Sequence, residues 1–358
     1  MRFFDHQDAA RAETRRLILA FALVVALLVA AVHGALTLAW WLMAWVIAIV
    51  LPLTLPPPAA FLEVNVGVSL LLVLGGWWVE TSQLRAGGER LARRIGAREA
   101  RPSVSHAEQR LCNVLEELCI AGGVARPQPM VLTRTEAINA FAAGWSEADA
   151  VIAVTQGALD GLSREELQGM VAHELSHLRE GDTRLNMRLA GMVFGLELVY
   201  NFGDSVRERG GLGAWFGSAI MAAGFAGWLA GRLLKAAVSR QREYLADARA
   251  VQWTRSRDGL GGVLRKVMTQ QRESKTRGLG ASGINHPAVQ HMLLAEAAHE
   301  RPLPRWLDSH PTLAQRVRRI YGRSMGPLAL EPLAAVPLAD AAQAADRAPA
   351  TEGPFTLV

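Results

Sequence analysis

The fold and chemistry of this chain are decided by residues 163–181, which read SREELQGMVAHELSHLREG. Ser163 followed three residues later by Glu166 forms a capping box, which predicts that a helix begins here. Gly181 predicts the end of that helix, because glycine tolerates the left-handed conformation common at helix C-termini. His173 and His177 then lie one turn apart on one face, so their ring nitrogens can reach a single ion.

This histidine pair favours a catalytic zinc site. Zinc in such sites binds three protein ligands and keeps one position for water. Glu174, next to the first histidine, is near enough to act on that water. The best third ligand is Glu243, although a surface glutamate paired with Arg240 or Arg242 is the alternative. Asp247, one turn after Glu243, can hydrogen-bond the free nitrogen of a ligating histidine and fix its tautomer.

The composition excludes a disordered chain and a disulfide scaffold. Of the 358 residues, 51% are hydrophobic and 20% are charged, and the mean hydropathy is +0.16. That balance excludes disorder and is high for a soluble enzyme. Cys112 and Cys119 are the only cysteines, too few for a disulfide framework or a cysteine-based zinc finger. No stretch resembles a nucleic-acid-binding motif, so we expect no nucleic-acid partner.

Two apolar runs near the N-terminus predict membrane spans. Residues 17–62 contain no charged side chain apart from His33, and a second apolar run covers residues 64–79. A spanning helix needs about 20 apolar residues. The first run exceeds this length, and the second falls slightly below it. Arginines precede the first run and follow the second, which places both flanks in the cytoplasm by the positive-inside rule.

The simplest topology for this region is a hairpin that crosses near residues 17–38 and returns near 62–79. Residues 39–61 then lie at the far interface. The competing interpretation is a third crossing within residues 36–55. It would place an arginine-rich flank on the wrong side of the membrane.

A further apolar region, residues 189–238, separates His173 from Glu243. Its second half, residues 212–234, is long enough to cross the membrane, whereas its first half contains Glu197 and could be a re-entrant span. Ligands of one ion must lie on one side of the bilayer, so this region crosses an even number of times or not at all. The sequence therefore predicts an integral membrane protein with its site facing the cytoplasm.

The expected fold class is mainly α with a small β-sheet, an α+β zincin-type metalloprotease domain, together with transmembrane helices. Helical periodicity predicts a helix over residues 102–117, and short strands are expected at 129–133 and 150–154. The expected organisation is an N-terminal membrane hairpin (1–80), a first protease segment (81–188), a second membrane hairpin (189–238), a second protease segment (239–325) and a flexible tail (326–358).

Several motifs give the chain a family resemblance over most of residues 85–322. They are Asn139-Ala140-Phe141-Ala142, the His173-Glu174-x-x-His177 helix, Gly181-Asp182, Arg242-Glu243-x-x-Ala246-Asp247, and Ser309-His310-Pro311 with Arg316. In this order and spacing they resemble the HtpX-like and CAAX-prenyl-protease-like family of membrane-bound zinc metallopeptidases. The two expected hairpins fit the HtpX branch better, and the chain is too short for the many-span branch.

The resemblance implies roles for the metal-binding and catalytic residues. His173, His177 and Glu243 would bind one zinc ion per chain, and Glu174 would be the general base. His310 would hydrogen-bond the oxyanion of the transition state. His286-Pro287 is a second His-Pro pair, but His310 is preferred because Arg316 follows it by six residues, as in the family pattern.

The resemblance also implies neighbouring roles. The strand formed by Asn139, Ala140, Phe141 and Ala142 would lie along the substrate backbone. Asp182 would either cap the end of the histidine helix or contact the site, and these two possibilities stay open.

The implied activity is hydrolysis of peptide bonds in membrane or misfolded proteins, a quality-control role. The implied partners are a polypeptide substrate and the lipid bilayer, and the oligomeric state is open. One alternative is a processing protease for a specific, possibly lipidated, peptide. Another is a catalytically silent membrane scaffold, which the intact Glu174 argues against.

Overall fold

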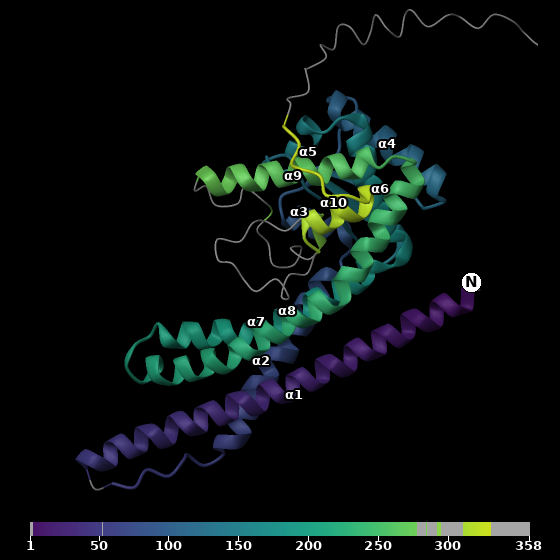
Figure 1. Cartoon of the computed structure of the whole chain (residues 1–358). Coiled ribbons are helices and arrows are strands. Elements are labelled where there is room, and N and C mark those ends of the chain that lie inside the picture. The colour runs from purple at the N-terminus through teal and green to yellow at the C-terminus, as the bar shows by residue number, and fades with distance from the viewer. Residues whose placement is uncertain (1–2, 52, 278–283, 285–291, 295–310, 331–358) are drawn as a thin grey trace, which may run out of the picture.

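The computed structural model describes residues 3–51, 53–277, 284, 292–294 and 311–330. Figure 1 shows four long helices, α1, α2, α7 and α8, that extend away from the domain holding α4, α6 and α9. The expected fold class is confirmed: helices predominate and surround one small sheet. The two His-Pro pairs, at His286 and His310, fall outside the described residues.

The N-terminal hairpin consists of α1 (Phe3–Val50) and α2 (Phe61–Leu84). The two helices are antiparallel: the rings of Phe21 and Trp77 lie 6.2 Å apart near one end, and those of Trp40 and Phe61 lie 6.0 Å apart near the other. Helix α1 is continuous through residues 36–50. The alternative third crossing in residues 36–55 therefore has no separate helix of its own.

The second hairpin consists of α7 (Asp182–Arg207) and α8 (Gly211–Thr254), with α7 packed between α2 and α8. Glycines allow the backbones to touch: a Cβ on Gly195 would lie 2.3 Å from the Val73 carbonyl oxygen, and one on Gly203 would lie 2.5 Å from the Met221 nitrogen. Small residues at helix contacts are typical of membrane helix packing.

Three of the described helices contain stretches long and apolar enough to cross a membrane. These stretches are Ile18–Val50, Phe61–Leu84 and Gly211–Leu234. Helix α8 then continues without a break into the domain, so the expected boundaries at 188 and 238 both fall inside helices.

The sheet has four strands in the described part of the chain, in the order β1-β2-β4-β3. They are β1 (Arg98–Glu99), β2 (Gln128–Leu132), β3 (Ala140–Ala143) and β4 (Val151–Thr155). Strands β2 and β4 are parallel and the other neighbours are antiparallel, with Phe141 opposite Ala153. Strand β3, which contains three of the expected substrate-binding residues, is therefore the last of these strands on its side, and its Phe141 forms an isolated antiparallel bridge with Leu293.

Helix α6 (Arg164–Glu180) lies at the centre of the domain and packs against α4 (His106–Gly122), α8 and α9 (Asp258–Arg277). Its capping box is formed as the sequence predicts: Ser163 Oγ accepts from the Glu166 amide at 3.2 Å, and Glu166 Oε2 accepts from the Ser163 amide at 2.8 Å. Gly181 ends the helix in the left-handed conformation, with φ 73°. The histidine motif is thereby fixed on a buried, rigid helix.

The smaller helices complete the domain. They are α3 (Gly88–Arg94), the 3₁₀ turn Glu147–Asp149, α5 (Gln156–Gly161) and α10 (Leu313–Tyr321). Helix α4 begins at His106 rather than near Pro102, because the Ser105 side chain caps it. Residues 326–330, expected to begin the flexible tail, lie along α9: Arg265 Nε donates to the Gly326 carbonyl at 2.7 Å and Thr269 Oγ1 donates to the Leu328 carbonyl at 2.6 Å.

Candidate metal centre

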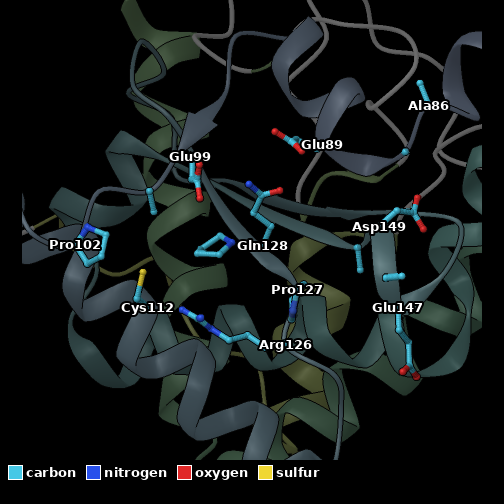
Figure 2. Close-up of a pocket in the computed structure, with 15 residues that line it drawn as sticks. Ala86, Glu89, Glu99, Pro102, Cys112, Arg126, Pro127, Gln128, Glu147 and Asp149 are labelled. Atoms are coloured by element: carbon cyan, nitrogen blue, oxygen red, sulfur yellow. The ribbon is translucent and has the colours of Figure 1, made fainter.

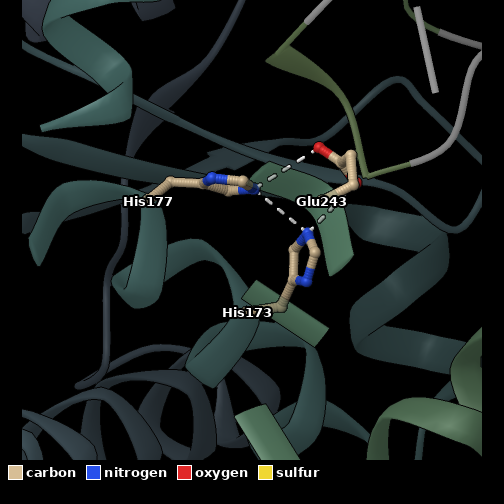
Figure 3. Close-up of side chains that lie close together, drawn as sticks. All are labelled: His173, His177 and Glu243. Carbon is tan, nitrogen blue, oxygen red and sulfur yellow. Dashed lines mark hydrogen bonds and ion pairs between the residues drawn. The ribbon is translucent and has the colours of Figure 1, made fainter. Parts of the chain in front are cut away.

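The side chains of His173, His177 and Glu243 converge at one point (Figure 3). The two Nε2 atoms lie 3.2 Å apart, and each lies 3.6 Å from one oxygen of the Glu243 carboxylate. All three residues are buried. Helix α6 provides both histidines, and α8 brings Glu243 to them from the end of the membrane hairpin.

The separations fit a single zinc ion. Two imidazole nitrogens bound tetrahedrally at the usual zinc–nitrogen length lie about 3.3 Å apart. The observed 3.2 Å between the Nε2 atoms agrees with that value. Two histidines and one glutamate are also a known ligand set of catalytic zinc sites. The residues therefore fit the expected metal in both chemistry and geometry.

In each histidine, the Nδ1 atom lies within hydrogen-bonding distance of a carboxylate oxygen. His173 Nδ1 lies 3.1 Å from Asp247 Oδ1, and His177 Nδ1 lies 2.9 Å from Asp182 Oδ2. A hydrogen bond of this kind places the ring proton on Nδ1 and leaves the Nε2 lone pair for a metal. Asp247 thus lies where the sequence predicts. Asp182, whose position was open, lies at the site.

Each of these carboxylates is bound in turn by an arginine. Arg316 is fully buried and donates to Asp247 from Nε at 3.0 Å and from Nη2 at 2.6 Å. Arg242 binds the Oδ1 atom of Asp182 through Nη1. Both arginines belong to the family motifs, and from the sequence Arg316 is expected near the site, whereas Arg242 has no expected role there other than a possible surface partner of Glu243. The signal available in the sequence was its position directly beside that predicted ligand.

Glu174 is buried next to the cluster, and the Ala142 amide of strand β3 lies within hydrogen-bonding reach of its carboxylate. Burial raises the pKa of Glu174 to about 7, against the opposing positive charges of His177 and Arg316. A carboxylate with such a pKa can take up and release a proton near neutral pH.

The two histidines differ in their preference for charge. Burial lowers the pKa of His177, but the hydrogen bond with Asp182 and the negative charge of Glu243 outweigh burial and raise it to about 9. Burial lowers the pKa of His173, and the Arg316 charge adds to the effect, although Asp247 opposes it. The cluster therefore stabilises positive charge near His177, as a cation-binding site should.

Strand β3 passes Glu174 with part of its edge already occupied. The Asn139 carbonyl accepts a hydrogen bond from the Thr155 amide, at the end of β4. Because successive residues of a strand direct their backbone groups to opposite sides, the N–H and C=O groups of Ala140 and Ala142 point away from β4. The Ala140 carbonyl accepts a hydrogen bond from the Leu294 amide at 3.0 Å. The Ala142 amide lies close enough to Glu174 to lower its pKa. On the side away from β4, the described edge of β3 is therefore partly paired, with Leu293 opposite Phe141 and the Ala142 amide facing Glu174.

The other predicted strand residues point inward. The Asn139 side-chain oxygen accepts from the Ala140 amide at 3.0 Å, and Phe141 is fully buried in the core. Neither observation assigns these side chains a contact with substrate.

A separate cavity of about 510 Å³ lies at the end of the sheet where β2 and β4 begin, lined by residues that include Glu99, Arg126, Gln128 and Asp149 (Figure 2). None of the predicted site residues lines it. The Asp149 carboxylate is already bonded to the amides of Trp145 and Ser146. The cavity thus lies apart from the metal-binding cluster.

Comparison with known proteins agrees with the geometry. A sequence model of Peptidase family M48 matches residues 105–324. The protease HtpX homologue of Dictyoglomus turgidum is 33% identical over 221 residues, which cover 60% of this chain and 69% of that protein. Protease HtpX of Legionella pneumophila is 30% identical over 215 residues, covering 58% of this chain and 74% of that protein. No solved structure matches the chain. The chain therefore belongs to Peptidase family M48, as an HtpX-like, membrane-anchored metalloprotease that hydrolyses peptide bonds.

Proposed function

We propose that the protein is a zinc metalloendopeptidase whose single zinc is held by His173, His177 and Glu243, with Glu174 as general base. The observation that carries the proposal is the convergence of two Nε2 atoms and one carboxylate within 4.8 Å, at the spacing that one zinc ion requires. The carboxylates of Asp247 and Asp182 support it by holding both rings in the metal-binding orientation.

The bound zinc would polarise the scissile carbonyl and lower the pKa of a water to about 7. Glu174 accepts the proton of the attacking water and passes it to the leaving amine nitrogen. Its buried position directly beside the three predicted ligands suits both transfers. Asp182 and Asp247 keep the imidazoles fixed while charge develops. His310 remains the predicted donor to the oxyanion.

The proposed substrates are membrane or misfolded proteins, bound as extended strands at the Ala142 end of β3. Main-chain pairing at a sheet edge gives affinity with little sequence selectivity, which suits quality control. The connection after β3 is tied to a membrane helix, because Trp145 Nε1 donates to the Leu84 carbonyl at the end of α2, at 2.8 Å. This contact supports access from the membrane surface.

We further propose that the site faces the cytoplasm of a bacterial cell, at the inner membrane. The paired hairpins support this, since they leave the N-terminus and the domain on the same side. The arginine-rich sequences after α2 support it as well.

Replacing Glu174 tests the function directly. Glu174→Gln keeps size and hydrogen-bonding capacity but cannot accept the proton, so zinc content should stay at about one per chain. Cleavage of an unfolded model protein should fall by roughly 10²–10⁴. Asp247→Asn is the contrast: zinc affinity should fall by roughly 10–100-fold, with activity partly restored by excess zinc. Wild-type cleavage by Glu174→Gln would exclude Glu174 as the base.

A further inference from the structure

We propose that Arg242 is a positioning residue for the metal-binding imidazole of His177 and that it acts through Asp182. The inference rests on the proposed zinc function. Asp247 binds the imidazole of His173, and Arg316 binds Asp247. In the same way, Asp182 binds the imidazole of His177, and Arg242 binds Asp182. The two predicted ligands therefore share one arrangement, of which the sequence predicted only the contact of Asp247 with a ligating histidine.

The two oxygens of Asp182 have separate partners. Oδ2 faces His177 Nδ1 at 2.9 Å, and Oδ1 binds Nη1 of Arg242. A carboxylate is free to rotate about its last torsion, which has broad energy minima. Binding one oxygen to a guanidinium restricts that rotation and keeps the other oxygen aimed at the imidazole. The side chain of Asp182 is 6% exposed, so water cannot readily take the place of the arginine.

The three residues come from three helices. His177 lies in the last turn of α6, Asp182 is the first residue of α7, and Arg242 is on α8 directly before Glu243. Helix α8 therefore contributes two neighbouring residues: Glu243, a predicted ligand, and Arg242, which orients the predicted ligand His177 through Asp182. The pair also joins α7 and α8 where the membrane hairpin meets the domain.

Arginine suits this role better than a general cation. Its guanidinium is planar, stays charged, and binds carboxylates with directed donors, whereas lysine offers a flexible point charge. The conservative substitution Arg242→Lys should therefore restore the charge but only part of the orientation. Zinc affinity in Arg242→Lys should lie between the wild-type value and that of Arg242→Gln.

A second ion pair on α8 provides the control. Arg249 binds the last residue of α6, with its Nη1 atom 2.6 Å from Glu180 Oε1, and its side chain is 26% exposed against 20% for Arg242. The Arg249–Glu180 pair joins α8 to the end of α6, two residues before Asp182. Among the contacts of the described residues it includes neither metal-binding histidine. Arg249→Gln thus removes an ion pair on the same helix and leaves the Arg242–Asp182–His177 contacts in place.

The test uses the full-length protein in detergent, with zinc affinity measured by chelator competition and ligand geometry by the visible spectrum of the Co²⁺-substituted protein. Arg242→Gln should weaken zinc binding by roughly 10–100-fold and alter the cobalt spectrum. Arg249→Gln should leave both unchanged. In a double-mutant cycle, Arg242→Gln should cost little more once Asp182→Asn is present, since coupled residues are not additive.

The proposal fails if Arg242→Gln or Arg242→Lys binds zinc and cobalt as the wild type does, or if Arg249→Gln loses as much zinc affinity. It also fails if the Arg242 and Asp182 effects add fully. A wild-type protein without zinc affinity would instead overturn the proposed function itself, so the two failures are distinguishable.

Discussion

At the scale of single residues, the buried cluster raises the pKa values of two neighbouring groups for different physical reasons. Burial makes Glu174 a weaker acid, with a pKa of about 7, while Asp182 and Glu243 make His177 a stronger base, with a pKa of about 9. In the metal-free protein the proton on His177 thus provides positive charge at the cluster. Metal binding must displace that proton, because a ligating histidine is neutral.

This competition predicts a pH-dependent zinc affinity. Below pH 9 His177 holds a proton that zinc must release, so the affinity should rise by about tenfold per pH unit for each released proton between pH 6.5 and 9. Isothermal titration calorimetry in buffers of different ionisation enthalpy measures both the affinity and the protons released. The control Asp182→Asn should show a shallower rise, since the carboxylate that raises the His177 pKa is gone. A wild-type affinity independent of pH over this interval would contradict the assignment.

Much of the site could be predicted at this scale, because its ligands follow local periodicity. The histidine pair and the Glu243–Asp247 pair are each one helical turn apart, so one face of one helix determines how they meet. Asp182 and Arg242 could not be paired in this way. Sixty residues of membrane hairpin separate them, and only the packing of α7 against α8 brings them together.

At the scale of elements, α6 depends on a close crossing with α9. A Cβ on Gly169 would lie 2.2 Å from the backbone nitrogen of Leu260. The helices can therefore approach this closely only because residue 169 has no side chain. The crossing packs α6, the helix that contains His173 and His177, closely against α9.

Substitution at this crossing should be costly. Gly169→Ala must move one helix backbone, so we expect a loss of roughly 1–3 kcal/mol in the free energy of unfolding. Gly161→Ala is the control, because its Cβ would meet only the end of the Ile138 side chain at 3.6 Å. Denaturant unfolding of the zinc-free proteins in detergent compares them. Equal stability of the two variants would show that the crossing tolerates a methyl group.

The capping box and Gly181 allowed α6 to be predicted to within a residue, since helix ends are determined by local hydrogen bonds. Helix α8 could not be predicted in the same way. The change from apolar to charged residues near 238 suggested a boundary, yet a change of polarity does not interrupt backbone hydrogen bonding, and α8 continues to Thr254. The strand pairing of Phe141 with Leu293 also depended on tertiary packing rather than on local pattern.

At the scale of the whole molecule, two helical hairpins and one domain share a single helix, α8. Its first half lies against α7 and α1, and its second half lies against α6 and provides Glu243. Glu243 is therefore connected to the proposed membrane segment by continuous helix. The described apolar stretches Ile18–Val50, Phe61–Leu84 and Gly211–Leu234 all have exposed apolar side chains suited to lipid.

The proposed topology predicts which surfaces are reachable from outside the cell. Single cysteines at the exposed positions Glu99 and Arg257, on the domain, should resist a membrane-impermeant thiol reagent in intact cells. A cysteine at Arg209, in the turn between α7 and α8, should react if that hairpin crosses the membrane. The native Cys112 and Cys119 are buried and provide a low background. Labelling of cysteines at positions 99 and 257, without labelling at position 209, would contradict the proposed topology and indicate the opposite orientation.

The central claim is one zinc ion bound by His173, His177 and Glu243, and X-ray absorption at the zinc edge tests it most directly. The purified wild-type protein should hold about one zinc per chain, surrounded by two imidazole nitrogens and by oxygen ligands at about 2.0–2.2 Å. The outer-ring scattering of imidazole distinguishes two histidines from one. A single imidazole, a sulfur ligand at about 2.3 Å, or a protein that retains no zinc would contradict the account.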